Sequence, residues 1–117
     1  MKTLILSFVL LFAVNVNAQN VNIPDANFKA YLVGEATINT NVDNEIQVSE
    51  ATAFNGQIFC PSMNISDLTG IEAFTALTEL FCDNNQLTSL NVTQNTALTL
   101  LSCGNSQLTS LDVTQNS

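Results

Sequence analysis

The last part of the chain carries one hydrophobic pattern twice. Residues 74–94 read FTALTELFCDNNQLTSLNVTQ and residues 95–115 read NTALTLLSCGNSQLTSLDVTQ, an offset of 21 residues. Near the start of the first copy, Leu80 and Cys82 alternate with Glu79, Phe81 and Asp83. Alternation with period 2 predicts a short strand that buries one side and exposes the other.

A repeat of this length with the spacing Leu-x-x-Leu-x-Cys-x-x-Asn-x-Leu is typical of leucine-rich repeats. Residues 55–73 form a less regular coil, which aligns with the first copy at an offset of 22 and turns Ile58 and Cys60 inward. We therefore expect an α/β solenoid of about three coils whose strands lie in a parallel ladder about 4.8 Å apart. The other recurring apolar positions should fill its core: Ile65, Leu68, Ile71, Leu87, Leu90, Val92, Leu108, Leu111 and Val113.

Three regions are expected along the chain. Residues 1–18 combine Lys2, an apolar run and a small-residue site before Gln19, which is typical of a secretory signal peptide. The run is short for a spanning helix, so an uncleaved membrane anchor is the less favoured alternative and no membrane insertion of the mature chain is expected. Residues 19–54 read as an N-terminal helical cap and residues 55–117 as the coils. The final residues, Asn116 and Ser117, begin another repeat, so we expect these coils to be a fragment of a longer array.

The cap is expected to contain two short helices. The pattern predicts one helix from Asp25 to Val33 and another from Val48 to Phe54. Phe28, Tyr31 and Leu32 have the i, i+3, i+4 spacing of one apolar helix face. This face should cover the open end of the first coil.

The loop between these helices resembles an EF-hand calcium loop. Asn39, Asn41 and Asp43 stand at positions 1, 3 and 5 and Glu50 at position 12, and Glu45 would contribute its backbone carbonyl at position 7. The first position lacks the usual Asp, and Asn44 replaces the glycine of position 6, where it would need a left-handed backbone. Weak calcium binding is one hypothesis; a metal-free turn held by Asn side chains is the other.

The three cysteines fall at equivalent inward positions of successive coils. Parallel Cβ vectors about 4.8 Å apart do not suit a disulfide, which needs about 3.5–4.5 Å. The spacing also lacks the close pairs of a zinc site. Buried thiols are the favoured interpretation of Cys60, Cys82 and Cys103. Asn85, by contrast, should satisfy buried backbone groups with its amide; Met63 and Ser106 hold the same position in the neighbouring coils.

The charge of the chain excludes several function classes. Beyond residue 18 a single cation, Lys29, stands against ten carboxylates, so the net charge there is about −9. Nucleic-acid binding requires Lys and Arg, and an anionic membrane surface is disfavoured for the same reason. The chain has no His, and its acids are scattered, so we expect no enzyme activity.

Taken together, several segments resemble the secreted leucine-rich-repeat proteins of Bacteroidetes bacteria, which are distantly similar to internalins. These segments are residues 23–28, 38–41, 45–50 and 63–71, and the Asn-x-Gln-Leu-Thr-Ser-Leu repeats. The resemblance implies exposure at the cell surface or secretion, and binding of a protein partner.

The sequence leaves two functions open. The first is a secreted or surface module for protein–protein interaction or adhesion, which would use the concave strand face. Phe59 and Phe81 would stack there in one column; otherwise the face is ordinary solvent-exposed surface. The second is a structural spacer or cap for a separate functional domain in a longer parent chain. The candidate contact residues are Phe59, Glu79, Phe81, Asp83, Leu100 and Ser102.

Overall fold

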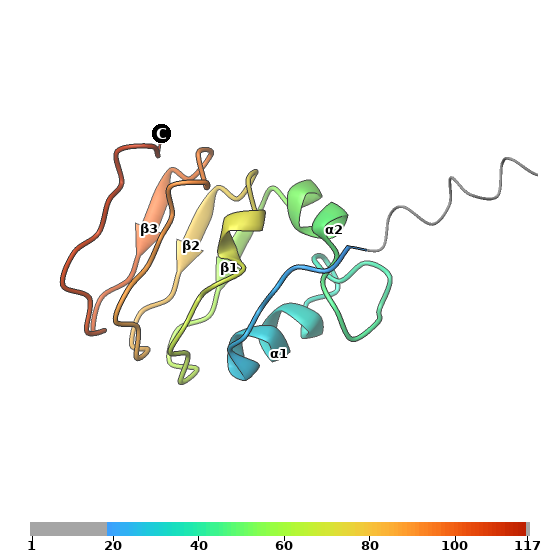
Figure 1. Ribbon diagram of the computed structural model, residues 1–117, viewed down its shortest axis with the longest axis horizontal. Helices are drawn as coiled ribbons and strands as arrows, with labels where there is room; N and C mark the ends of the chain where they lie inside the picture. The colour runs from blue at the N-terminus through green and yellow to red at the C-terminus, as the bar shows by residue number, and fades with distance from the viewer. Residues whose placement is uncertain (1–18, 117) are drawn as a thin grey trace, which may run out of the picture.

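The computed structural model describes residues 19–116, so the expected signal peptide and Ser117 lie outside the described residues. Two helices lie at one end and three strands follow toward the other (Figure 1). Within residues 19–116 no helix has the length and hydropathy needed to cross a membrane. The elements in chain order are α1 (Ala26–Gly34), α2 (Val48–Ala53), β1 (Gln57–Phe59), the 3-10 helix η2 (Ile71–Ala73), β2 (Glu79–Phe81) and β3 (Leu100–Ser102).

The three strands form one parallel sheet in the order β1-β2-β3. Ile58 pairs with Leu80, and Leu80 pairs with Leu101, which reproduces the offsets of 22 and 21 expected from the sequence. The ladder continues past the strand ends. Cys60 N–H donates to the carbonyl of Phe81 at 2.8 Å, and Cys82 N–H donates to that of Ser102 at 2.8 Å. The expected parallel ladder is therefore confirmed.

The core lies behind the sheet and follows the repeat. Ile58, Leu80, Leu87 and Val92 are fully buried, as the alternation predicts. The expectation is wrong for the last coil, where Leu111 and Val113 are 38% and 49% exposed. Each coil buries its apolar side chains against the coils on both sides, and within residues 19–116 no further coil covers this one. Leu101, Cys103 and Leu108 are half-buried there.

Two buried asparagines tie neighbouring coils together. The Asn85 Oδ1 atom accepts from the N–H groups of Met63 and Ile65 at 3.0 Å each. Its Nδ2 donates to the carbonyls of Cys60 and Cys82 at 2.9 and 3.0 Å, which confirms the role expected for this amide. Each of these bonds replaces a hydrogen bond to water that the buried backbone has lost.

Asn95 is fully buried and also bonds the backbone of the neighbouring coil, at another side of the stack. Its Nδ2 donates to the carbonyl of Ile71 at 2.8 Å and to that of Phe74 at 3.0 Å. Asn116, one repeat later, donates in the same way to the carbonyls of Val92 and Asn95. Asn95 and Asn116 thus make an asparagine column across two coils, which is absent from the expectations above, whereas Asn85 is the single asparagine at its position of the repeat.

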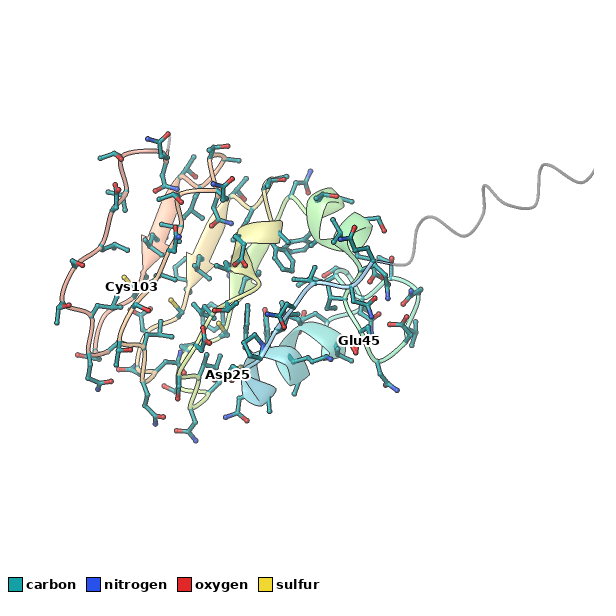
Figure 2. The ribbon with its side chains drawn as sticks, in the orientation of Figure 1. Asp25, Glu45 and Cys103 are labelled. Carbon is teal, nitrogen blue, oxygen red and sulfur yellow. The ribbon has the colours of Figure 1, made fainter. Side chains whose placement is uncertain are left out.

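The helical cap closes the first coil. Asp25 is the N-cap of α1 and its Oδ1 accepts from the N–H groups of Asn27 and Phe28, while its Oδ2 accepts from Ser66 N–H of the first coil (Figure 2). Burial raises the pKa of Asp25, but these hydrogen bonds outweigh it and hold the pKa below its usual value. One carboxylate therefore both starts the helix and fixes it to the repeats.

The predicted helices agree with α1 and α2 to within two residues at each end. Phe28 and Leu32 are fully buried and Tyr31 is half-buried, so the apolar face is confirmed. The Tyr31 hydroxyl accepts from Phe59 N–H at 3.0 Å. This bond satisfies a donor on β1, the edge strand, and reduces its capacity to pair with another chain.

All three cysteines in the described chain are free thiols, with Cys60 and Cys82 buried and Cys103 half-buried. Burial raises the pKa of the Cys60 thiol to about 12 and also raises the pKa of Cys82 and Cys103. The thiols therefore stay protonated near neutral pH and pack as small apolar groups, as expected.

Removing the Asn85 amide should weaken the stack. In Asn85→Ala the amides of Met63 and Ile65 and two carbonyls lose their partners, which should lower the free energy of unfolding by at least about 2 kcal/mol. Chemical denaturation measures this change. Gln94→Ala, at an exposed position of the same coil, is the control and should stay within about 0.5 kcal/mol of wild type. An equal, small effect of both variants would contradict the role given to Asn85.

Candidate functional site

The outward side chains of the sheet form the candidate site, which we call the strand face. It consists of Gln57, Phe59, Glu79, Phe81, Leu100 and Ser102 on the strands, with Asp83 just after β2. Burial alternates along β1 and β2 as the sequence predicts, with Ile58 and Leu80 buried between more exposed neighbours. The structure brings the six predicted contact residues onto one surface.

An aromatic pair stands near the middle of the strand face. Phe59 and Phe81 are register partners, and their ring centroids lie 5.6 Å apart with the planes tilted by 50°. This separation is within the range of favourable aromatic contacts. Phe59 is 52% exposed despite the pairing, and Leu100 on β3 is 44% exposed. The strand face therefore offers apolar surface that no described side chain covers.

The two carboxylates of the strand face differ in their contacts. Asp83 Oδ1 accepts from the Ser102 hydroxyl and from Gly104 N–H, both at 2.8 Å. These two bonds hold the pKa of Asp83 below its usual value, and the bond from Ser102 has the larger effect. Glu79 has no side-chain hydrogen bond or ion pair among residues 19–116. Asp83 is thus a fixed anion, and Glu79 is free to turn toward a ligand.

The loop that resembles an EF-hand is arranged around a carboxylate. Glu50 is 9% exposed, and its Oε1 accepts from the N–H groups of Thr40 and Asn41 and from the Thr40 hydroxyl, at 2.7–3.2 Å. Its Oε2 accepts from Gln47 N–H at 3.0 Å, which closes the capping box of α2. Burial raises the pKa of Glu50, but the hydrogen bonds outweigh it and the pKa lies below its usual value.

The other two carboxylates of the loop also have partners within the protein. Asp43 Oδ1 accepts from Glu45 N–H, and its Oδ2 accepts from the amide nitrogens of Asn41 and Gln47. Both carboxylate oxygens of Glu45 accept from the Lys29 ammonium group, at 2.8 and 2.7 Å; Figure 2 shows Glu45 beside α1. Asn39 is buried and its Nδ2 donates to the carbonyls of Val33 and Asp43, whereas its Oδ1, the atom that would bind calcium, has no hydrogen-bond partner in residues 19–116.

The backbone of the loop departs from an EF-hand too. The left-handed residue is Val42, with φ at 61°, whereas Asn44, at the position of the EF-hand glycine, is not left-handed. Among residues 19–116 no three acidic, Cys or His side chains converge as a metal site would require. The EF-hand form of the cap is not confirmed. Calcium binding stays a prediction, and the contacts fit the metal-free turn better, because loop N–H groups point at the Glu50 carboxylate.

Known proteins of similar sequence share this fold. No protein-family model matches the chain. Internalin J of Listeria monocytogenes serotype 4b (strain F2365) is 39% identical over 73 residues, which are 62% of this chain and 8% of internalin J. A solved structure of the functional domain of InlJ from Listeria monocytogenes, described as including a cysteine ladder, matches 85% of this chain and 22% of its own, with 37% identity and a TM-score of 0.71.

The described repeats are internalin-like. A second solved structure, of an internalin (inlF) from Listeria monocytogenes strain 4b F2365, has a TM-score of 0.68 over 84% of this chain and 29% of its own; at 18% identity it supports the fold alone. The chain spans less than a tenth of the length of internalin J. The internalin-like part of the resemblance is thus confirmed, and an origin in Bacteroidetes stays a prediction.

Neutralising Glu50 should destabilise the cap. Glu50→Gln puts an amide N–H where the carboxylate accepts loop N–H groups, which should lower the free energy of unfolding at neutral pH by about 1–3 kcal/mol. Because folding lowers the pKa of Glu50, this stabilisation is present above the pKa of the unfolded chain and is lost as the pH falls through the folded pKa. The gap between wild type and Glu50→Gln should therefore narrow in acid.

Denaturation curves at several pH values measure this gap. The control is Glu35→Gln. Glu35 is exposed, and its carboxylate accepts no hydrogen bond from any group in the described chain. A gap between wild type and Glu50→Gln that stays constant into acid would contradict the role of the ionised carboxylate.

Calcium should have no effect on the stability of the cap. With the carboxylates of Asp43 and Glu50 already hydrogen-bonded, the melting temperature should be equal in chelator and in millimolar calcium. Differential scanning calorimetry provides the comparison. A rise in melting temperature with calcium that disappears in Asp43→Asn would show that the loop rearranges into a calcium site.

Proposed function

We propose that this chain is a secreted or cell-surface module that binds a protein partner through its strand face and mediates interaction or adhesion. The single observation that supports this best is the contact between Phe59, which is exposed, and Phe81, which is half-buried, on the outer side of the sheet. Aromatic side chains supply much of the binding energy at protein interfaces, where they tend to lie near the centre. Leu100 extends the apolar surface of the pair across β3.

The buried residues and the hydrogen-bonded ladder that hold the strand face in place favour the same function. Each outward side chain alternates with a buried one, such as Ile58 or Leu80, and the parallel ladder fixes their spacing. Side chains held in this way lose little conformational freedom when a partner docks. The similarity to internalin J agrees with a binding module.

Peptide selection tests this proposal. Random twelve-residue peptides displayed on phage are selected on the purified protein, and their affinities for variants are then compared. Phe81→Ala should weaken selected peptides at least about tenfold, because it removes a central aromatic contact of the kind that contributes 1–2 kcal/mol or more. Phe59→Ser, at the more exposed ring, should act in the same direction.

Leu111→Ala is the matched control, because Leu111 is an exposed apolar residue outside the strand face. It should leave the affinities unchanged. The melting temperature of each variant is also measured, so that a loss of affinity caused by unfolding can be distinguished from one caused by a lost contact. Selected peptides that bind both folded phenylalanine variants as well as wild type would overturn the proposal and favour a spacer or cap.

A further inference from the structure

Two acids flank the aromatic pair on the strand face. Glu79, Phe81 and Asp83 alternate along one stretch of chain, so their side chains leave the sheet on the same side. The hydrogen bond from Ser102, an outward residue of β3, to Asp83 Oδ1 confirms this placement for Asp83. Phe81 therefore stands between two carboxylates, with Phe59 against it on the next strand.

No cation of the described chain neutralises these two acids. Lys29 is the only basic residue among residues 19–116, and both oxygens of Glu45 bind its ammonium group. Glu79 has no side-chain partner within that range, and Asp83 uses one oxygen for both of its hydrogen bonds. The second oxygen, Oδ2, keeps its accepting capacity for a group from outside.

Aromatic faces and carboxylates attract the same kind of ligand. The face of a phenylalanine ring is the negative end of its quadrupole, and it favours a guanidinium or ammonium group placed above it. A guanidinium group is also planar, stacks on aromatic rings and can bond a carboxylate with two N–H groups at once. A cation above Phe59 and Phe81 would have a carboxylate on either side of Phe81.

We propose that the partner presents an arginine side chain, carried on a basic segment of protein, to the strand face, where Phe59 and Phe81 stack on the guanidinium group and Glu79 and Asp83 bind it. This inference rests on the proposed function and names the chemistry of the partner. A second copy of this chain does not fit, because the sequence contains no arginine and Lys29 is already paired.

The test uses the peptides selected on the wild-type protein. The peptides that depend on Phe81 should be enriched in arginine relative to the unselected library. In the tightest of them, arginine is replaced by citrulline, which has nearly the same shape and no charge. The replacement should weaken binding about fivefold to tenfold, from the cation–π contact and the exposed ion pairs with Glu79 and Asp83.

The reciprocal change is made in the protein. In the double variant Glu79→Gln/Asp83→Asn the preference for arginine over citrulline should fall to the part that the cation–π contact supplies, because the two carboxylates are gone and the two rings remain. The amide oxygen that Asp83→Asn introduces can still accept from Ser102 and Gly104, so the fold should persist. Melting curves check that it does.

The matched control is Asp67→Asn/Asp112→Asn, which removes the same charge away from the sheet. Both acids hold a Thr two residues later in a turn, and Asn91 makes the same turn with Thr93, so Asn is tolerated there. This control should keep the full preference for arginine over citrulline. An equal loss in both double variants would show that net charge alone attracts the peptide and would overturn the inference.

The outcomes for the two proposals can be told apart. Selected peptides that need Phe81 but show no enrichment of arginine and no loss with citrulline would overturn the arginine inference and leave the proposed function standing. Selected peptides that do not need Phe59 or Phe81 would overturn both.

Discussion

The register of the parallel ladder is the constraint on which this structure depends. Ile58, Leu80 and Leu101 occupy one column, and the residues on either side of them point the other way. Because side chains alternate along a strand, a slip by one residue would bury the strand face and expose the core. The asparagine bonds of Asn85 and Asn95 hold neighbouring coils at a fixed offset and so oppose such a slip. The same register that builds the core places Phe59 beside Phe81.

The carboxylates of this acidic chain serve two different purposes. In the cap, Asp25 and Glu50 accept N–H groups that would otherwise lack partners, and these bonds lower the pKa of both. On the strand face, Glu79 and one oxygen of Asp83 have no such partner among residues 19–116. Backbone amides satisfy Asp25 and Glu50 in the cap, whereas Glu79 and one oxygen of Asp83 remain available to a group from another molecule.

Much of this could be predicted from the sequence, because repetition reveals it directly. The period determined which residues align, alternation determined which of them face inward, and both held for Ile58, Leu80 and Phe81. The first helix of the cap followed from its apolar spacing, and the second followed from the resemblance of the loop to an EF-hand, which a helix flanks on either side. Asn95 could have been found from its recurrence as Asn116, but the equivalent position in the preceding coil holds Phe74, so only two asparagines mark the repeat.

Other features depend on contacts distant in sequence, which no local pattern contains. The hydrogen bond between Phe59 and Tyr31 joins residues 28 positions apart, and the one between Ser66 and Asp25 spans 41. The loop of residues 39–50 has the residue types of a calcium loop, yet Glu50 accepts N–H groups from that loop. Residue types alone do not say whether a carboxylate faces a cation or an amide.

Nuclear Overhauser contacts in the isotope-labelled protein test the register most directly. The observed pairing predicts contacts between the rings of Phe59 and Phe81, and separately between the side chains of Ile58 and Leu80. Contacts between Phe59 and Leu80 instead, with Ile58 exposed, would show a register shifted by one residue and would contradict both the core and the strand face described above.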